Sequence, residues 1–373
     1  MDKNFIDKTF PGIFDHYLEQ QNQRFNYESI VTRIVNDKMI RLANQASHSE
    51  CILNDRGDCN HLIKAHAIQN NGILNKLAEN GKVIYIGERS SFNIKNPKEH
   101  LVGRNEATTF KGFCKIHDEI FNPIEHENYS VGNLQQNFLF AYRAFARAYN
   151  NNFTSAKFFE NYIQEMVENP ALESLLEKQA GKGLDSKETR EFKKKVVIAR
   201  QEYRLKQLRE VERDFNQLKI VLNKNLHNER YNKIQTEVME IPVKNTIASS
   251  SLTYIYADLH GHPFNRLLKF PSFLTLIPQG NTTYFLFSYL SKHKHYFKEF
   301  IDQLRDVKEN EIELVISNLF LKYGDNLCFS PQIFEKFSQK EIDMIGNGIN
   351  RNTQFPGEKL VVYPVNIFRP LQG

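Results

Sequence analysis

The chain has 373 residues, 40% of them hydrophobic and 25% charged, which is long enough for two or three domains and typical of a globular protein. Its net charge of +5 permits a polyanionic partner without requiring one. Four unevenly spaced cysteines, the lack of a signal-peptide core at the start and the lack of a long apolar run argue against the secreted disulfide-rich and transmembrane classes, so we expect a cytoplasmic protein.

Residues 1–50 are expected to form a helical lead-in that packs on the segment after them. Beyond a short arm, apolar residues such as Ile30, Ile34 and Leu42 recur at intervals of three to four, which is typical of one face of a helix. Polar residues 47–49 then form a loop before the first cysteine. Nothing in this stretch points to a function.

Soft metal ligands gather between residues 51 and 121. This segment holds three of the four cysteines and four of the twelve histidines: Cys51, Cys59, His61, His66, His100, Cys114 and His117. Thiolates and imidazoles together are typical ligands of tetrahedral Zn²⁺. Cys114 and His117 open a predicted helix, and Cys51 and Cys59 flank a turn-rich loop, so we predict that these four residues bind a structural zinc ion. As alternatives, His61 replaces Cys59, or the cysteines are buried free thiols beside a surface histidine.

His66 follows the first cysteine pair in a segment, residues 64–68, that is typical of a short strand. A knuckle, an Ala-His-x-Ile strand and a second knuckle that opens a helix together resemble the HNH endonuclease family, which has a ββα-metal fold of the treble-clef kind. In that family the histidine of the strand activates water, and a divalent cation nearby holds the scissile phosphate. The resemblance implies that His66 is the general base and that Asp118 or His117 lies near a catalytic Mg²⁺ or Mn²⁺. As alternatives, His66 is a core histidine or another zinc ligand.

The residues between His66 and Cys114 are expected to alternate between strands and loops. Gly81 and Gly87 bound one predicted strand, and residues 108–110 are predicted to form the strand that leads to the second ligand pair. Basic residues recur through this segment: Lys82, Arg89, Lys95, Lys98, Arg104, Lys111 and Lys115. We expect them either to follow the phosphate backbone of a nucleic acid or to form a solvated loop surface.

Long helices are predicted in the middle of the chain. An aromatic stripe predicts a buried helix face, formed by Phe138, Tyr142, Phe145 and Tyr149. We expect Asn150–Asn152 to end that helix and residues 158–166 to form another. Residues 186–226 contain no Pro or Gly and carry a heptad-like apolar seam, so we predict one helix of roughly 60 Å. Its seam would pair with another helix of the chain, a second copy in a homodimer, or a partner protein.

The C-terminal part is predicted to be an α+β domain, because strand patterns precede helical ones. The predicted strands are 238–241, 246–256, 273–277 and 282–289, and the predicted helices are 296–304, 309–322 and 333–345. Asp258, His260 and His262 form the one alternative metal site in this part, although the nearby Gly and Pro favour a polar turn.

The expected fold class is therefore α+β. We predict a helical lead-in over residues 1–50, an HNH-like zinc module over 51–130, a helical region over 131–233 and an α+β domain over 234–373. The lack of G-x-S-x-G, P-loop and Rossmann motifs argues against serine hydrolases and those nucleotide-binding classes. We expect a metal-dependent HNH-like endonuclease acting on nucleic acid, and the resemblance suggests bacterial restriction or antiphage defence. The alternative is a non-catalytic, zinc-stabilised scaffold that binds through the long helix and the C-terminal domain.

Overall fold

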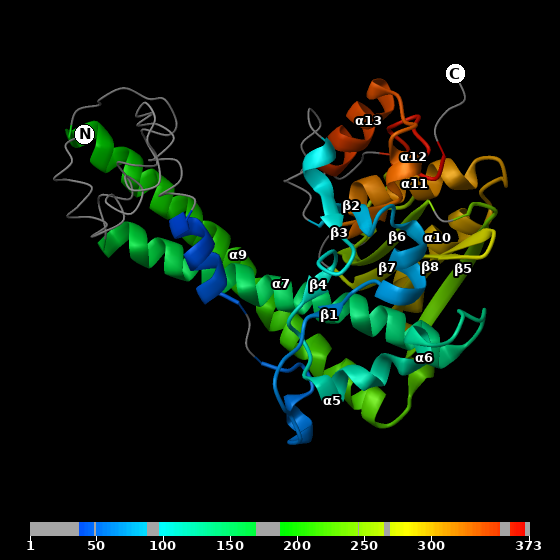
Figure 1. Ribbon diagram of the computed structural model, residues 1–373, viewed down its shortest axis with the longest axis horizontal. Coiled ribbons are helices and arrows are strands. Elements are labelled where there is room, and N and C mark those ends of the chain that lie inside the picture. The colour runs from blue at the N-terminus through cyan, green and yellow to red at the C-terminus, as the bar shows by residue number, and fades with distance from the viewer. Residues whose placement is uncertain are drawn as a thin grey trace. The chain divides into compact units, whose positions relative to one another are not determined.

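The computed structural model describes residues 37–47, 50–87, 97–168, 187–244, 246–264, 269–350 and 359–369 (Figure 1). Two compact units divide the chain. The first contains residues 1–48 and 151–216, and the second contains residues 49–150 and 217–373. The predicted periodicity at Ile30 and Ile34 lies outside the described residues. Among those described, no helix combines the length and the apolar character needed to cross a membrane.

The described part of the first unit is helical. It contains a helix over residues 37–45, residues 151–168 of α7 (Leu134–Glu168) and residues 187–216 of α9 (Lys187–His227). Lys38 Nζ lies 2.7 Å from the Glu165 carboxylate, and Arg209 pairs with Glu160. These ion pairs connect its helices to one another.

Helix α9 confirms the long helix predicted for residues 186–226, but the predicted break at Asn150–Asn152 is wrong. Helix α7 continues without interruption to Glu168 because tertiary hydrogen bonds satisfy the asparagine side chains. Asn150 Nδ2 donates to the Lys111 carbonyl at 2.8 Å, and Asn152 Nδ2 donates to the Leu208 carbonyl at 3.1 Å. These contacts outweigh the low helix propensity of asparagine.

An antiparallel sheet of seven strands organises the second unit (Figure 1). In spatial order the strands are β3 (Leu101–Gly103), β2 (Lys82–Ile86), β9 (Leu327–Phe329), β6 (Ile247–Tyr254), β7 (Pro271–Gln279), β8 (Thr282–Leu290) and β5 (Ile234–Ile241). The hairpin predicted around Gly280 joins β7 to β8, and Gly280 has a φ of +64°, which glycine adopts readily. Strand β9 was not predicted. Strands β2 and β3 come from the segment between His66 and Cys114, so this segment shares a sheet with the C-terminal strands.

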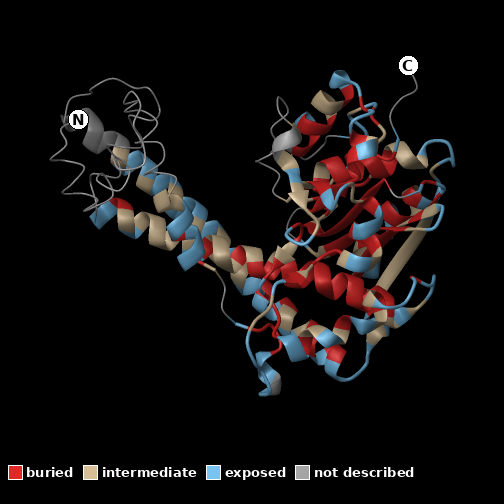
Figure 2. Ribbon diagram, in the orientation of Figure 1, coloured by how far each residue is buried: buried red, intermediate tan, exposed pale blue. Residues whose placement is uncertain are grey.

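Both faces of the central strands are covered, since every residue of β6 except Tyr254 is buried (Figure 2). A hydrophobic core joins the sheet to α10 (Lys294–Arg305), α11 (Ile312–Tyr323) and α13 (Gln339–Asn350), and α12 (Pro331–Phe334) adds Phe334. The Phe287 ring, for example, lies 5.5 Å from the Phe297 ring and 5.1 Å from the Phe300 ring. The chain is therefore α+β as predicted, with a long helix and an antiparallel sheet.

A second sheet has two strands, β1 (Ala65–His66) and β4 (Thr109–Phe110), and several short helical elements belong to the same part of the sequence. They are η1 (Asn54–Arg56), the π-helical turn η2 (Asn70–Leu74), α4 (Asn75–Leu77), η4 (Pro97–His100), α5 (Lys115–Asp118), η5 (Glu119–Phe121) and α6 (Asn122–Glu125). Two more 3-10 turns, η6 (Tyr231–Lys233) and η7 (Ser291–His293), adjoin β5 and α10. This small sheet carries His66 and leads directly into Cys114.

The aromatic stripe of α7 is part of the core, as predicted. Phe138, Tyr142, Phe145 and Tyr149 are all buried. Consecutive rings along the stripe lie 5.6 to 6.1 Å apart, so the aromatic side chains pack on one another rather than on solvent.

Candidate metal centre

A tight loop holds the first two cysteines. Cys51 is followed by the 3-10 turn η1, which ends at Gly57 with a φ of +79°, a left-handed conformation that glycine adopts without strain. The Asn54 amide donates to the Cys51 carbonyl at 3.1 Å, and the Ile52 amide donates to the Gly112 carbonyl at 2.9 Å. The loop therefore closes on itself and on the segment that leads to Cys114.

The second pair of ligands lies at the start of α5. Cys114 has an extended backbone and precedes the helix, and its carbonyl accepts a 3.0 Å hydrogen bond from the Asp118 amide. His117 follows in the same turn and is buried. A β-bridge between Leu62 and Cys114 draws the two halves of the site together.

Three sulfur atoms converge on one nitrogen of His117. Nδ1 lies 3.3 Å from the Sγ atom of Cys51, 3.5 Å from that of Cys59 and 3.4 Å from that of Cys114. All four ligand atoms lie within 4.8 Å of one another. Zinc–sulfur bonds of about 2.3 Å and a zinc–nitrogen bond of about 2.0 Å, meeting at a tetrahedral angle, place sulfur and nitrogen about 3.5 Å apart. The arrangement thus has the dimensions of a tetrahedral zinc site.

Hydrogen bonding alone does not explain this cluster, because Nδ1 has one lone pair and three thiols face it. Burial raises the pKa of the Cys51 thiol to about 12, so a thiolate there requires a compensating cation. Burial also acts to raise the pKa of Cys114, but backbone N–H groups, that of Asn60 first, outweigh it and hold that pKa below its ordinary value. The donor set fits Zn²⁺.

The four predicted zinc ligands are therefore brought together, and the cluster can hold a zinc ion. Cys59 belongs to it, whereas His61 is exposed and does not. Four protein ligands close a tetrahedral site and leave no open position for a substrate, which is typical of structural zinc. On its other side, the His117 ring faces Asp58, with 2.8 Å between Nε2 and Oδ1.

His66 lies on β1, where it pairs with Thr109 of β4. Its Nε2 atom is buried and has no hydrogen-bond partner among the described residues. Burial lowers the pKa of His66, although the backbone of Arg104 and of Asn105 acts in the opposite direction, as carbonyl acceptors for the protonated ring do. The lowered pKa favours the neutral imidazole near pH 7, and Nε2 has no partner from the described part of the chain.

Two charged groups, Arg143 and Glu125, act electrostatically on His66, and the same two groups act on Asp118. Arg143 of α7 is buried, pairs with the Glu125 carboxylate and lies over the Phe121 ring, 4.2 Å from its centroid. Burial raises the pKa of Asp118, while the Arg143 charge acts to lower it and the Glu125 charge to raise it. The charges of Glu125 and Arg143 also act on the pKa of His66, in opposite directions.

Sequence reasoning named His66 and Asp118 but missed Glu125 and Arg143. A signal for Arg143 was present, since it stands in the apolar run of residues 138–149, where a buried charge requires a partner. Nothing local in the sequence points to Glu125 as that partner.

The alternative site at Asp258 is a polar turn. The Asp258 carboxylate accepts hydrogen bonds from the backbone amides of His260 and His262, at 2.9 Å and 2.8 Å, and from Gln303 Nε2 at 2.9 Å. Its Oδ2 atom lies 3.0 Å from His262 Nδ1. Asp258 is thus used within the loop, as expected of an aspartate that closes a turn.

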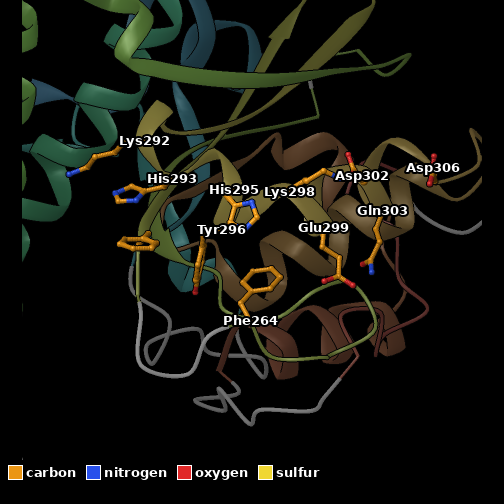
Figure 3. A pocket seen from close by; sticks show the side chains of 11 residues that line it. Phe264, Lys292, His293, His295, Tyr296, Lys298, Glu299, Asp302, Gln303 and Asp306 are labelled. Carbon is orange, nitrogen blue, oxygen red and sulfur yellow. Dashed lines mark hydrogen bonds and ion pairs between the residues drawn. The ribbon is translucent and has the colours of Figure 1, made fainter.

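A cavity of about 920 Å³ lies beside α10 (Figure 3). Its aromatic wall includes Phe264 and Tyr296, whose ring centroids are 5.0 Å apart. Its charged rim is partly neutralised, since Lys298 Nζ lies 2.6 Å from the Asp302 carboxylate. The cavity has no group in common with the candidate metal centre.

No protein-family model, curated protein or solved structure matches the chain. What the structure itself supports is the coarser feature, a cluster of Cys51, Cys59, Cys114 and His117 that could bind a metal.

Proposed function

We propose that the protein is a zinc-stabilised, HNH-like endonuclease that cleaves the phosphodiester bonds of nucleic acid with the help of a divalent cation. The observation that carries this proposal is the unpartnered Nε2 of His66 on β1, in a two-stranded sheet that leads directly into the Cys114–His117 pair. The order of loop, sheet and ligand-bearing helix is the order expected of a treble-clef nuclease module.

His66 is the proposed general base. Its lowered pKa keeps the imidazole neutral at pH 7, so that Nε2 can accept a proton from a water molecule. Backbone carbonyl groups at Arg104 and Asn105 would hold the proton on the other nitrogen and fix the tautomer. A histidine that served only the core would use both nitrogens in hydrogen bonds.

Asp118 is the proposed ligand of the divalent cation. Glu125 is a second carboxylate close enough for its charge to act on the pKa of Asp118. A bound Mg²⁺ or Mn²⁺ supplies charge stabilisation at the phosphate. Among the described residues, Cys51, Cys59, Cys114 and His117 form the one group of three or more convergent metal ligands. A catalytic Mg²⁺ would therefore be held by one or two carboxylates together with phosphate oxygens and water, as is usual for this ion.

Nucleic acid is the proposed partner. Lys82, Lys111 and Lys115 are exposed on the segment that carries the site, and the whole chain has a net charge of +5. Lysine contacts to phosphates supply affinity without sequence preference. A role in restriction or antiphage defence, in the cytoplasm, is the biological setting that we propose for such an enzyme.

The test is cleavage of DNA and RNA by the purified protein with Mg²⁺ or Mn²⁺. We expect His66→Ala to lower the cleavage rate by at least about 100-fold, within the range that general base catalysis contributes. His61→Ala is the matched control, because His61 is exposed, follows Cys59 by two residues and belongs to neither proposed site. Equal cleavage by wild type and His66→Ala would refute the role of His66.

A second candidate function is a zinc-stabilised scaffold without catalysis. The closed four-ligand cluster favours it, and so do the exposed Val196 and Tyr203, which lie seven residues apart on α9 and suit a partner helix or a second copy of the chain. Bound zinc without cleavage under any divalent cation, together with self-association lost in Tyr203→Glu, would favour this function.

A further inference from the structure

We propose that Asp58 is a positioning residue for the zinc centre, whose carboxylate orients the His117 ring so that Nδ1 faces the ion. This inference depends on the zinc centre that forms part of the proposed function, but not on nucleic-acid cleavage. It assigns a role to an exposed residue that the ligand pattern in the sequence does not mark.

The two nitrogens of His117 face different partners. Nδ1 faces three sulfur atoms at 3.3 to 3.5 Å, and Nε2 lies 2.8 Å from Asp58 Oδ1. A neutral imidazole has a proton on one nitrogen and a lone pair on the other. Only the tautomer with its proton on Nε2 leaves the Nδ1 lone pair for a metal, and a carboxylate next to Nε2 stabilises that tautomer.

No other described residue competes for this position. The His117 side chain is 1% exposed, so water cannot readily replace a protein acceptor at Nε2. That atom has no aligned hydrogen-bond partner among the described residues, and Asp58 is the group at contact distance. Because the Asp58 side chain is 59% exposed, its carboxylate has room to rotate into line with the N–H bond.

The chain places the ligand and its orienting group on one loop. Asp58 directly precedes Cys59, and both follow the left-handed turn at Gly57. The same backbone segment therefore delivers a thiolate to Nδ1 and a carboxylate to Nε2. This arrangement explains why one end of the cluster is exposed: Cys59 reaches solvent, whereas Cys51 and Cys114 are buried.

The experiment measures the zinc affinity of the full chain by competition with a chromophoric chelator, at fixed pH. Carboxylates that orient metal-bound histidines typically contribute 10- to 100-fold in affinity, and the exposure of Asp58 favours the lower end. We expect Asp58→Ala to weaken zinc binding by about 10-fold and Asp58→Asn, which keeps an oxygen acceptor, by less. Glu50→Ala is the matched control, because Glu50 is an exposed carboxylate next to the ligand Cys51.

A second readout separates orientation from simple charge. In zinc-loaded wild type, ¹⁵N NMR of the His117 ring should show an Nε2–H proton that exchanges slowly with water, and in Asp58→Ala that exchange should be faster. Equal zinc affinities for Asp58→Ala and Glu50→Ala, or an unchanged exchange rate, would overturn the role of Asp58. Both readouts are independent of cleavage. A protein that binds zinc through this geometry but does not cleave nucleic acid would refute the nuclease proposal and leave the role of Asp58 standing.

Discussion

Tyr142 donates a 2.7 Å hydrogen bond to the Oδ1 atom of Asn223, and both side chains are buried. Tyr142 belongs to α7 and Asn223 to the C-terminal part of α9. The Nδ2 atom of Asn223 donates in turn to the carbonyl of Ile52, at 3.1 Å, and lies 3.4 Å from the Asp55 carboxylate. A single buried amide thus ties the cysteine loop to two helices.

The first prediction concerns this amide. Asn223→Ala removes the hydrogen bond that Tyr142 donates and the one that the Ile52 carbonyl accepts, both of them buried. We expect a loss of about 2 to 4 kcal/mol in the free energy of unfolding, measured by urea denaturation of the zinc-loaded protein. Tyr142→Phe, which removes one hydrogen bond, should cost about 1 to 2 kcal/mol. Equal effects of the two variants would contradict a shared role for the amide.

The second prediction concerns the metal. Cys51→Ser or Cys114→Ser should abolish tight zinc binding, and the purified variants should contain far less than one equivalent of zinc. Because a structural zinc ion contributes folding free energy, the melting temperature should fall by roughly 10 °C or more. Cys328→Ala is the control, since Cys328 is buried on β9 outside the cluster. It should destabilise the chain but leave the zinc content unchanged.

The candidate metal cluster could be predicted because cysteine is rare in the rest of the chain. Cys51, Cys59, Cys114 and His117 stand out by residue type, and the C-x2-H spacing places two of them in one helical turn. Glu125 and Arg143 could not be paired from the sequence, because their contact depends on the packing of α6 against α7. Local spacing carries no information about such a contact.

The fold predictions that were wrong or incomplete have similar causes. Strand β9 has three residues, and its pairing with β2 and β6 on either side is long-range. The helix predicted for 333–345 is in fact two helices, α12 and α13, because Ser338 caps the second one. The Glu341 carboxylate accepts hydrogen bonds from the Ser338 amide at 2.8 Å and its hydroxyl at 2.7 Å. The S-x-x-E pattern of residues 338–341 is the sequence signature of this cap.

The third prediction concerns the ion pair between the buried Arg143 and the half-buried Glu125. Arg143→Met removes the guanidinium and leaves the Glu125 carboxylate without its partner, so we expect a loss of about 2 to 4 kcal/mol in the free energy of unfolding. Glu125→Gln alone leaves a buried cation and should also destabilise. The loss of unfolding free energy in the double variant should be smaller than the sum of the two single losses by about 1 kcal/mol or more. Strict additivity would show that the two charges do not interact.

The fourth prediction concerns acid stability. His293 stacks on Phe270 with ring centroids 3.7 Å apart, and burial, with a smaller contribution from Lys292, lowers the pKa of His293 to about 4. Between pH 4 and 6.5 the unfolded chain, with a histidine pKa of about 6.5, therefore binds a proton that the folded chain does not. The stabilisation that arises from this difference between the folded and unfolded pKa values of His293 is fully present above pH 6.5 and is lost as the pH falls towards 4. His293→Phe should flatten the curve of unfolding free energy against pH between pH 4 and 6.5, measured by denaturant unfolding. An unchanged slope would contradict the lowered pKa of His293 in the folded chain.

The last prediction concerns the pH dependence of cleavage. A general base acts in its neutral form, and burial holds the pKa of His66 below its ordinary value. The acid limb should therefore be centred below pH 6.5, and the rate should level off as the pH rises above it. The Glu125 charge favours the imidazolium, so Glu125→Gln should move the acid limb to lower pH, whereas the control Glu127→Gln, an exposed carboxylate two residues away, should leave it in place. Single-turnover rates at saturating Mg²⁺, measured across the pH range, give the position of the acid limb in wild type and in each variant. An acid limb centred above pH 6.5 in wild type would exclude His66 as the titrating base.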